Sequence, residues 1–288
     1  EEKNYEVLRG RRHEKVIREF YHEDARRCAE WFIYGEVSPE CKVPCDDFEN
    51  HFSEEWKRKD DYDRSSPLLA LEESVDEEAR EWFLKKLTDA EEIVKVVRSK
   101  ANMSAAGLDG ISNVVWKTDA VTTSLLVSRL LMAMLSSGKV PAAWKRSKTV
   151  MLFKKGQSDD VKSWRPISLT PTLYRITMGH VANVVQELNA HNRIFSYAQK
   201  GFIARTNGCS EHIAVLNELV ADATRHRKDI NILTLDFADA FGSVDHRQIV
   251  DGLKSLGFPH KFCNWIKHLY KDNVTVFSVN GEVGHTIP

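Results

Sequence analysis

The sequence predicts an α+β protein with two or three lobes. Apolar residues recur at steps of three and four over long stretches, which is the pattern of amphipathic helices. Two stretches rich in β-branched residues and interrupted by short turns, 147–169 and 274–287, indicate β-hairpins. A further strand, Asn231–Asp236, ends in a single acidic residue. The length of 288 residues provides material for a large core and favours several lobes over one unit.

The overall composition is that of a globular protein and does not indicate a partner. Hydrophobic residues make up 42% and charged residues 29%, and the formal net charge is -1. A nucleic-acid partner must therefore be sought in local clusters of basic residues. No apolar run reaches the ~18 residues of a membrane helix, and the charged N-terminus is unlike a signal peptide. We expect no membrane partner, and we expect the chain to be a piece of a longer polypeptide, because it starts at Glu1 and stops at Pro288 without a tail.

The five cysteines are an odd number spread over the chain, which favours reduced thiols in an intracellular compartment over a disulfide framework. Cys41 and Cys45, with His51 nearby, offer the alternative of a zinc half-site. The second pair of ligands is missing and the spacing is loose, so the pattern favours free thiols over zinc.

Residues 5–34 are expected to form a helix with one apolar face and one face rich in basic residues. Two interpretations of the basic face remain open. It is either a solvated surface of salt bridges, or a surface that grips a phosphate backbone. The candidate RNA-binding residues on it are Arg11, Arg12, Lys15, Arg26 and Arg27.

A connector from Ser38 to Ser74, with a short helix at 48–56, leads to two helices at 75–87 and 89–100. The spacing of Ser74 from Glu77 and of Thr88 from Glu91 fits two capping boxes. Next, Gly107 and Gly110 predict a tight turn before a helix, and a longer helix over 121–137 ends at Gly138.

The hairpin at 147–169 belongs to the one clear positive cluster of the chain. Between residues 139 and 165 the only acids are Asp159 and Asp160, and the basic residues are Lys139, Lys145, Arg146, Lys148, Lys154, Lys155, Lys162 and Arg165. Lysines at the turn, with Arg165 beside an aromatic residue, suit the grip of a polyphosphate. The alternative is a basic surface hairpin that only confers solubility.

The remainder of the chain is expected to form four more helices, a loop region and a hairpin. Helices are expected at 171–188 and 209–227, with a short basic strand or loop at 199–205. Lys200 and Arg205 in this stretch are two further candidate RNA-binding residues. A helix over 246–256 begins at the N-cap Asp245, and another runs from Pro259 to Tyr270. Asn280 and Gly281 predict a type I′ turn in the last hairpin.

Asp236 is the residue whose chemistry needs an explanation. A carboxylate at the end of a buried strand costs free energy unless it is paired, and no lysine or arginine lies near it in the strand. A divalent metal is a natural partner, since Mg²⁺ binds one or two carboxylates together with substrate phosphates. Two-metal phosphoryl transfer uses carboxylates from two strands, so one acid supplies half of such a site. Phe241 would then lie beneath the sugar of a nucleotide.

Several motifs resemble those of reverse transcriptases, in the expected order. "LDFADAFGSVDH" is similar to their motif A, "LFKKG" and "SWRPISLTPTLYRI" to the fingers motifs that clamp the triphosphate, and "QKGFIARTNGCSEHI" to the next motif. "AAGLDGI" resembles the segment upstream of these motifs in non-LTR (LINE-type) retrotransposon reverse transcriptases, and "RRCAEWFIYGE" resembles the N-terminal extension of the site-specific clade with a restriction-like endonuclease. The resemblance covers nearly the whole chain.

The resemblance implies a right-hand, polymerase-like fold with three regions. Residues 1–100 would be a helical, RNA-binding N-terminal extension, 101–228 the fingers, and 229–288 a partial palm that stops before the second catalytic motif. It also implies two Mg²⁺ ions in the complete enzyme, an element RNA template, a target DNA primer and deoxynucleoside triphosphates. The reaction would be target-primed reverse transcription, inside the cell and in the nucleus at the site of insertion.

The roles of single residues follow from the same resemblance. Asp236 matches the metal-binding aspartate, and the carbonyl of Phe237 matches the second ligand of that segment. Phe241 matches the steric gate, and Arg165 the arginine on the triphosphate. The fingers lysine is Lys154 or Lys155, a choice that the motif leaves open. Two other acids of the motif are assigned structural roles, Asp239 as a solvated position and Asp245 as a helix cap.

The chain departs from the family pattern in one respect, because it contains no Tyr-x-Asp-Asp sequence. We therefore expect the parent protein to be an RNA-directed DNA polymerase and this chain to bind RNA without polymerising. The alternative is a catalytically inert RNA-binding module on a polymerase-like scaffold. The joint presence of Asp236, Phe241, Arg165 and the turn lysines favours the polymerase, and paired aspartates encoded after Pro288 would decide between the two.

Overall fold

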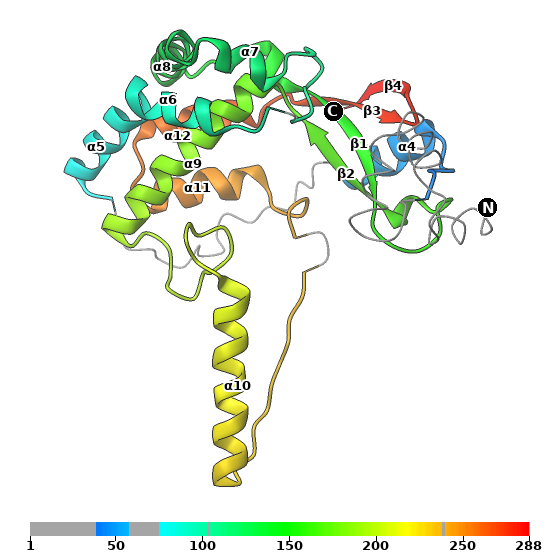
Figure 1. The fold of residues 1–288 in the computed structure, drawn as a ribbon, viewed down its shortest axis with the longest axis vertical. Coiled ribbons are helices and arrows are strands. Elements are labelled where there is room, and N and C mark those ends of the chain that lie inside the picture. The colour runs from blue at the N-terminus through cyan, green and yellow to red at the C-terminus, as the bar shows by residue number, and fades with distance from the viewer. Residues whose placement is uncertain (1–38, 58–74, 103, 238–239, 288) are drawn as a thin grey trace, which may run out of the picture. The chain divides into compact units, whose positions relative to one another are not determined.

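The computed structural model describes residues 39–57, 75–102, 104–237 and 240–287 (Figure 1). The chain divides into two compact units. The first comprises Glu1–Glu54, Thr149–Ser168 and Val276–Thr286, and the second comprises Glu55–Lys148, Leu169–Thr275 and Ile287–Pro288. Each unit is described by itself. The predicted helix at 5–34 and its candidate RNA-binding residues lie outside the described residues.

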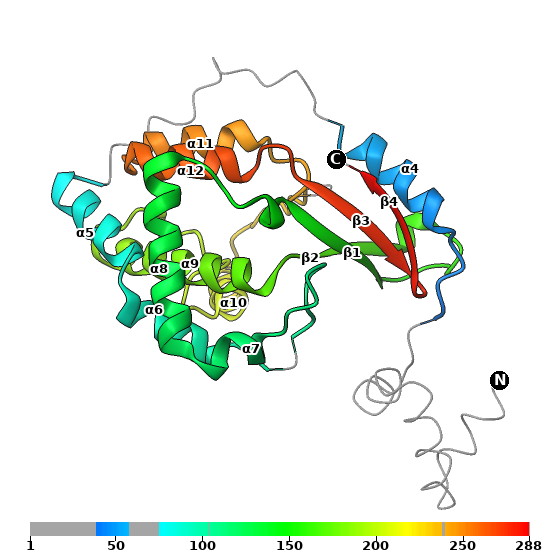
Figure 2. The same ribbon diagram turned by 90° about the horizontal axis from the view of Figure 1, so that it is seen from above.

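The first unit is built on a four-stranded sheet with the strand order β2-β1-β3-β4 (Figure 2). Its strands are β1 (Arg146–Phe153), β2 (Trp164–Leu169), β3 (Val274–Val279) and β4 (Glu282–Ile287). Both predicted hairpins are confirmed. Asn280 and Gly281 have φ values of 49° and 86°, as the two central residues of a type I′ turn require.

Helix α4 (Cys45–Glu55) lies beside β3 and β4 (Figure 2) and confirms the helix predicted at 48–56. The rings of Phe48 and Phe52 stack on Phe277 of β3, with centroid distances of 6.5 and 5.7 Å. The Asn280 side chain donates a hydrogen bond to the Cys41 carbonyl, with 2.8 Å between the two atoms. Stacked aromatic rings and this hydrogen bond therefore attach the segment before and within α4 to the sheet.

The second unit is mainly helical, and its helices confirm those predicted from periodicity. They are α5 (Glu77–Leu87), α6 (Ala90–Ser99), α7 (Asn113–Thr118), α8 (Ala120–Ser137), α9 (Thr172–Asn192), α10 (Gly208–His226), α11 (His246–Ser255) and α12 (His260–Leu269). The 3₁₀ turn η1 (Ala142–Lys145) of this unit precedes β1, whereas η2 (Val161–Ser163), which precedes β2, belongs to the first unit. Gly138 ends α8 in the left-handed conformation, as predicted.

The N-caps of α5 and α6 differ from the predicted ones. Asp76 caps α5 and Asp89 caps α6, each through a carboxylate oxygen that accepts a backbone N–H. Thr88, the predicted N-cap of α6, is instead the C-cap of α5, and its hydroxyl donates to the Leu84 carbonyl. The prediction was wrong because an aspartate next to the threonine supplies a charged acceptor at the positive end of the helix. Ser74 lies outside the described residues.

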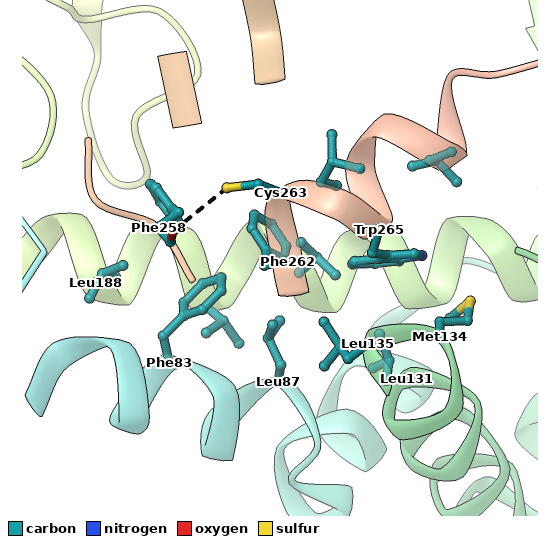
Figure 3. Packing of buried hydrophobic residues seen from close by; sticks show 14 of the residues in the cluster. Phe83, Leu87, Leu131, Met134, Leu135, Leu188, Phe258, Phe262, Cys263 and Trp265 are labelled. Atoms are coloured by element: carbon teal, nitrogen blue, oxygen red, sulfur yellow. Dashed lines mark hydrogen bonds between the residues drawn. The ribbon is translucent and has the colours of Figure 1, made fainter. Parts of the chain in front are cut away.

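The core of the second unit is a cluster of aromatic and aliphatic side chains from α5, α8, α9 and α12 (Figure 3). Phe83 packs edge-on against Phe258 and Phe262, at centroid distances of 5.3 and 4.9 Å. Trp265 and Leu87 are fully buried beside them. These residues come from segments almost 180 positions apart in sequence, so the core ties the C-terminal helices to α5.

Helix α8 corrects the expectation that no apolar run is long enough to cross a membrane. Within the described residues it is the one helix that is long and apolar enough, with 18 residues, a mean hydropathy of 1.4 and 44% of it buried. Length and composition alone are weak grounds, because the core helix of a soluble protein passes the same test. Val127 and Leu131 are fully buried in the core cluster, where Figure 3 labels Leu131, and this burial accounts for the apolar sequence.

The predicted turn around Asp109 is confirmed and lies against the start of α9. The Gly110 N–H donates to the Gly107 carbonyl over 3.1 Å, and Gly110 has a φ of 66°. A Cβ atom on Gly107 would come within 2.7 Å of the backbone nitrogen of Pro171, so only glycine fits at this close approach.

The predicted strand Asn231–Asp236 is wrong. This segment forms neither helix nor strand, and Figure 1 shows it as a long connection between α10 and α11. Leu233 and Leu235 are 82% and 79% exposed. No described strand pairs with the segment, and a single strand cannot satisfy its own backbone groups. The other segment left open, Gln199–Arg205, is a loop.

Candidate nucleic-acid interface

The basic turn between β1 and β2 presents the candidate triphosphate residues to solvent. Lys154 and Lys155 are exposed at the turn, and the Lys154 N–H donates to the Ser163 carbonyl over 2.8 Å, which closes the hairpin. Gly156 follows with a φ of 106°, and a Cβ there would lie 2.5 Å from the Ser163 hydroxyl. The hydrogen bond and the glycine therefore fix the backbone of the turn, and the two lysine side chains remain exposed to solvent.

The alternation of side chains along β2 places Arg165 on the exposed face of the strand. Trp164 is buried, packs edge-on against Phe153 at 5.2 Å, and donates through its ring N–H to the Ser158 carbonyl. Successive side chains of a strand point to opposite faces, so burial of Trp164 leaves Arg165 exposed, as observed. In the first unit, Lys154, Lys155 and Arg165 thus all belong to one exposed basic hairpin.

The loop before α10 holds Lys200 in an ion pair. Lys200 Nζ lies 2.7 Å from a Glu211 oxygen and 3.7 Å from the centroid of the Tyr197 ring, and its side chain is only 12% exposed. The hydrogen bond to Glu211 raises the pKa of Lys200. An RNA phosphate would have to compete with Glu211 for this ammonium group. Arg205 is exposed in the same loop.

Asp236 is exposed, in contrast to the expected position at the end of a buried strand. Its Oδ1 accepts the N–H of Phe237, the next residue, over 3.0 Å. The argument that a buried carboxylate must be paired with a metal therefore does not apply to the observed conformation. The assignment of Asp236 and of the Phe237 carbonyl to a metal depends on the resemblance to reverse transcriptases alone.

The described residues do not build the expected two-metal site. Among them, a set of three ligand atoms within 4.8 Å of one another is found at Asp46, Glu49 and His285, and Asp236 is not part of it. Glu49 already accepts the backbone N–H of His285. One exposed carboxylate and one carbonyl are too few to hold two Mg²⁺ ions, so no catalytic step on this chain is assigned to a metal.

Phe241 and Asp245 follow Asp236 on the way to α11. Phe241 is 80% exposed and packs edge-on against Phe202, with a centroid distance of 6.0 Å. An exposed aromatic ring can stack on a sugar or a base. Asp245 is the N-cap of α11 and pairs with Arg247 at 2.6 Å, which confirms its structural role. Asp239 lies outside the described residues.

Two basic residues that the sequence analysis did not single out lie near the glycine turn of the second unit. Arg175 of α9 donates to the Ala105 carbonyl, and its Nε atom is buried without a hydrogen-bond partner among the described residues. Burial together with the nearby Arg175 lowers the pKa of Lys100. Their positions in the sequence could have pointed to these two residues. Arg175 lies in "TLYRI", and Lys100 directly precedes the turn segment.

Comparison with known proteins finds a similarity to reverse transcriptases over part of the chain. Residues 153–287 match the family model "Reverse transcriptase (RNA-dependent DNA polymerase)". This range covers slightly less than half of the chain and contains every candidate residue from Lys154 to Phe241.

The curated relatives narrow the class to non-LTR retrotransposons. The chain is 29% identical over 176 residues to a "Retrovirus-related Pol polyprotein from type-1 retrotransposable element R2" of Popillia japonica, with 61% of this chain and 23% of the relative covered. It is 26% identical over 199 residues to a "Probable RNA-directed DNA polymerase from transposon BS" of Drosophila melanogaster, with 69% and 22% covered. It is 26% identical over 180 residues to the R2DM polyprotein of the same species, with 62% and 16% covered.

These relatives confirm the resemblance to non-LTR retrotransposon reverse transcriptases, and the mixed helices and sheet fit an α+β, polymerase-like fold. The chain spans between 16% and 23% of the length of the three relatives.

Proposed function

We propose that the chain is part of an RNA-directed DNA polymerase that copies retrotransposon RNA into DNA by target-primed reverse transcription. The single observation that carries the proposal is the family match over residues 153–287, which includes Lys154, Lys155, Arg165 and Phe241. The template would be the element RNA, the primer a target DNA, and the substrates deoxynucleoside triphosphates. The enzyme would act in the nucleus at the site of insertion.

Within this function, each region of the chain has a proposed part. Residues 1–100 form the RNA-binding N-terminal extension, 101–228 the fingers, and 229–288 the first part of the palm. The similarity to R2 polyproteins supports the further proposal that the parent belongs to the clade with a restriction-like endonuclease.

The exposed basic hairpin is proposed to hold the triphosphate. Arg165 offers a planar group that can bind two phosphate oxygens at once, and Lys154 or Lys155 adds a point charge. Phe241 would contact the sugar. Asp236 and the Phe237 carbonyl would be metal ligands in the complete enzyme, where two Mg²⁺ ions would stabilise charge on the transferred phosphate.

This chain is proposed to bind RNA but not to polymerise by itself. Its sequence has no Tyr-x-Asp-Asp motif, and among the described residues no other ligand joins Asp236 in a metal-binding group. The second candidate, an inert RNA-binding module on a polymerase-like scaffold, is favoured by the exposure of Asp236. The two candidates differ in whether the parent protein synthesises DNA.

Primer extension tests this difference. The parent protein should extend a DNA primer on an RNA template, and the Asp236→Ala variant should lose extension while keeping nearly unchanged RNA affinity. An Asp251→Ala variant, which changes a carboxylate on α11, is the control and should remain active. Extension by the Asp236→Ala variant would exclude the metal assignment, and a parent protein without any extension activity would support the inert module.

RNA binding by the 288-residue chain is measured separately, as an association constant at several salt concentrations. Replacement of Arg11, Arg12, Arg26 and Arg27 by alanine should lower the affinity and make it less dependent on salt. An unchanged affinity would place the RNA surface elsewhere on the chain.

A further inference from the structure

Two cationic side chains meet on helix α9. Lys100 follows α6, and a Cβ atom on Gly179 of α9 would lie 2.5 Å from Lys100 Nζ and 3.4 Å from its Cε. The ammonium group therefore lies against α9 at Gly179. Arg175 is four residues earlier, on the same face of the helix. The fold thus brings together two cations that are 75 positions apart in sequence.

The surroundings of this pair are well determined by hydrogen bonds. Lys117 Nζ donates to the Lys100 carbonyl over 2.9 Å and to Asn102 Oδ1 over 2.7 Å. The Thr172 hydroxyl donates to the Ile111 carbonyl over 2.8 Å, and Gly107 lies against Pro171. The segment 100–111 is therefore held by Lys117 of α7 near Lys100 and by Thr172 of α9 at Ile111, and Arg175 donates to the Ala105 carbonyl within it.

The pair has no acidic counter-charge among the described residues. None of the ion pairs recorded for them includes Lys100, Lys117 or Arg175. Burial and the positive charge of Arg175 lower the pKa of Lys100, and no carboxylate opposes this shift. The buried Nε–H of Arg175 also has no acceptor in the described residues. Two adjacent cations and a buried free donor are costly unless an anion supplies acceptor atoms and negative charge.

We propose that Lys100 and Arg175 bind one backbone phosphate of the RNA, an inference that depends on the RNA binding proposed above. Phosphate oxygens accept from both guanidinium and ammonium groups. A phosphodiester carries a single negative charge, which suits a site of two cations, whereas a triphosphate carries several charges and would need more of them. The site lies in the second unit and uses none of the residues assigned to the triphosphate.

The first test is the salt dependence of RNA binding by the 288-residue chain. Each phosphate contact to a single strand contributes about 0.7 to the slope of log K against log salt. Lys100→Met should therefore reduce the slope by about 0.7, which means about threefold less affinity lost between 50 and 200 mM salt. Lys95→Met is the matched control, because Lys95 lies on α6, five residues before Lys100, is exposed, and is paired with Glu92.

Gly179→Ala tests the same site without removing a charge. The added methyl group would meet only the end of the flexible Lys100 side chain, and alanine favours the helix, so the fold should be kept or slightly stabilised. The ammonium group must then leave its position against α9 at residue 179. The variant should bind RNA more weakly than the wild-type chain although its thermal unfolding temperature is not reduced.

Chemical modification of lysines identifies the ligand. Acylation of Lys100 and Lys95 is followed by mass spectrometry with no addition, with a single-stranded RNA, and with a deoxynucleoside triphosphate. Protection of Lys100 by RNA, with Lys95 unprotected, supports the inference. Protection by the triphosphate alone overturns it. If the chain binds RNA and neither Lys100→Met nor Gly179→Ala changes binding, the phosphate site is wrong and the proposed function stands. If the wild-type chain binds no RNA, both are wrong.

Discussion

Strand β3 and the segment 231–236 carry similar apolar side chains in opposite surroundings. In β3, Phe277 is fully buried against the rings of α4, and the strand lies between β1 and β4. In the segment, Leu233 and Leu235 are mostly exposed, and no described strand lies beside it. The difference teaches that a strand depends on its neighbours, because its backbone hydrogen bonds are made to another strand.

Helix α10 shows that a helix, unlike a strand, forms with little contact to neighbouring elements. Ala223 is its one buried residue, and Ile213, Val215 and Leu219 are more than half exposed. It is nevertheless a helix of 19 residues, since its backbone groups pair within the helix itself. The helix persists without covering side chains, whereas the adjacent segment does not form a strand.

The largest effect that tests this comparison is expected at Phe277. Phe277→Ala should lower the free energy of unfolding by roughly 3–5 kcal/mol, because it leaves a cavity among the rings of Phe48 and Phe52. Chemical denaturation followed by tryptophan fluorescence measures the change. A loss below about 1 kcal/mol would mean that α4 does not pack on β3 in solution.

The sequence predicted those elements whose stabilising contacts are close along the chain. The hairpins at 147–169 and 274–287 and the helix ended by Gly138 have their turns and caps within a few residues. The exposed positions of Lys154, Lys155 and Arg165 follow from the same local rules. The strand predicted at Asn231–Asp236 was wrong, because a β-branched and apolar pattern indicates a preference for strand but does not provide a neighbouring strand to pair with.

A smaller effect is expected at the turn that joins β3 and β4. Gly281 has a φ of 86° and nothing within 4 Å of an added Cβ, so Gly281→Ala tests backbone conformation alone. The left-handed conformation costs an L-residue roughly 1–2 kcal/mol, and the free energy of unfolding should fall by that amount. Gly252→Ala is the control, since Gly252 also has open space but lies inside α11, where alanine should stabilise by roughly 0.5–1 kcal/mol.

Equal effects of the two substitutions would contradict the type I′ turn. They would also weaken the contrast between β3 and the segment 231–236, because that turn sets the pairing of β3 with β4.

The pH dependence of stability tests the helical unit. His180 is 1% exposed, and its Nε2 lies 3.1 and 3.2 Å from the carbonyls of Lys86 and Leu87. Burial lowers the pKa of His180, and the carbonyls, Glu92 and Asp89 oppose this only in part. Below the pKa of an unfolded histidine, about 6.5, the unfolded chain binds a proton that the folded chain does not. Stability should therefore fall as the pH drops from about 6.5 to the lowered pKa.

His180→Gln keeps an N–H donor for the two carbonyls and removes the titration. Thermal unfolding between pH 7.5 and 5 should show a weaker pH dependence in this variant than in the wild-type chain. His260→Gln, which changes an exposed histidine at the start of α12, should behave like the wild-type chain. Identical pH profiles for all three proteins would show that His180 is not buried in solution.

The candidate site was less predictable than the fold. The pairing of Lys200 with Glu211, and the meeting of Lys100 with Arg175 on α9, depend on contacts that no local pattern encodes. Residues 75 positions apart are brought together only by the packing of α6 and α9. The role of Asp236 was predicted from the motif. Its exposure was not predicted, because exposure depends on whether other strands lie beside the segment.

The smallest effect is expected in the segment 231–236 itself. Leu233→Ala should change the free energy of unfolding by less than about 0.5 kcal/mol, because the side chain is 82% exposed and has little to lose. The same denaturation experiment as for Phe277→Ala measures it, so the two values compare the regions directly. A loss of several kcal/mol would mean that Leu233 is buried in solution, and that Asp236 then ends a packed strand, as the resemblance to reverse transcriptases leads us to expect.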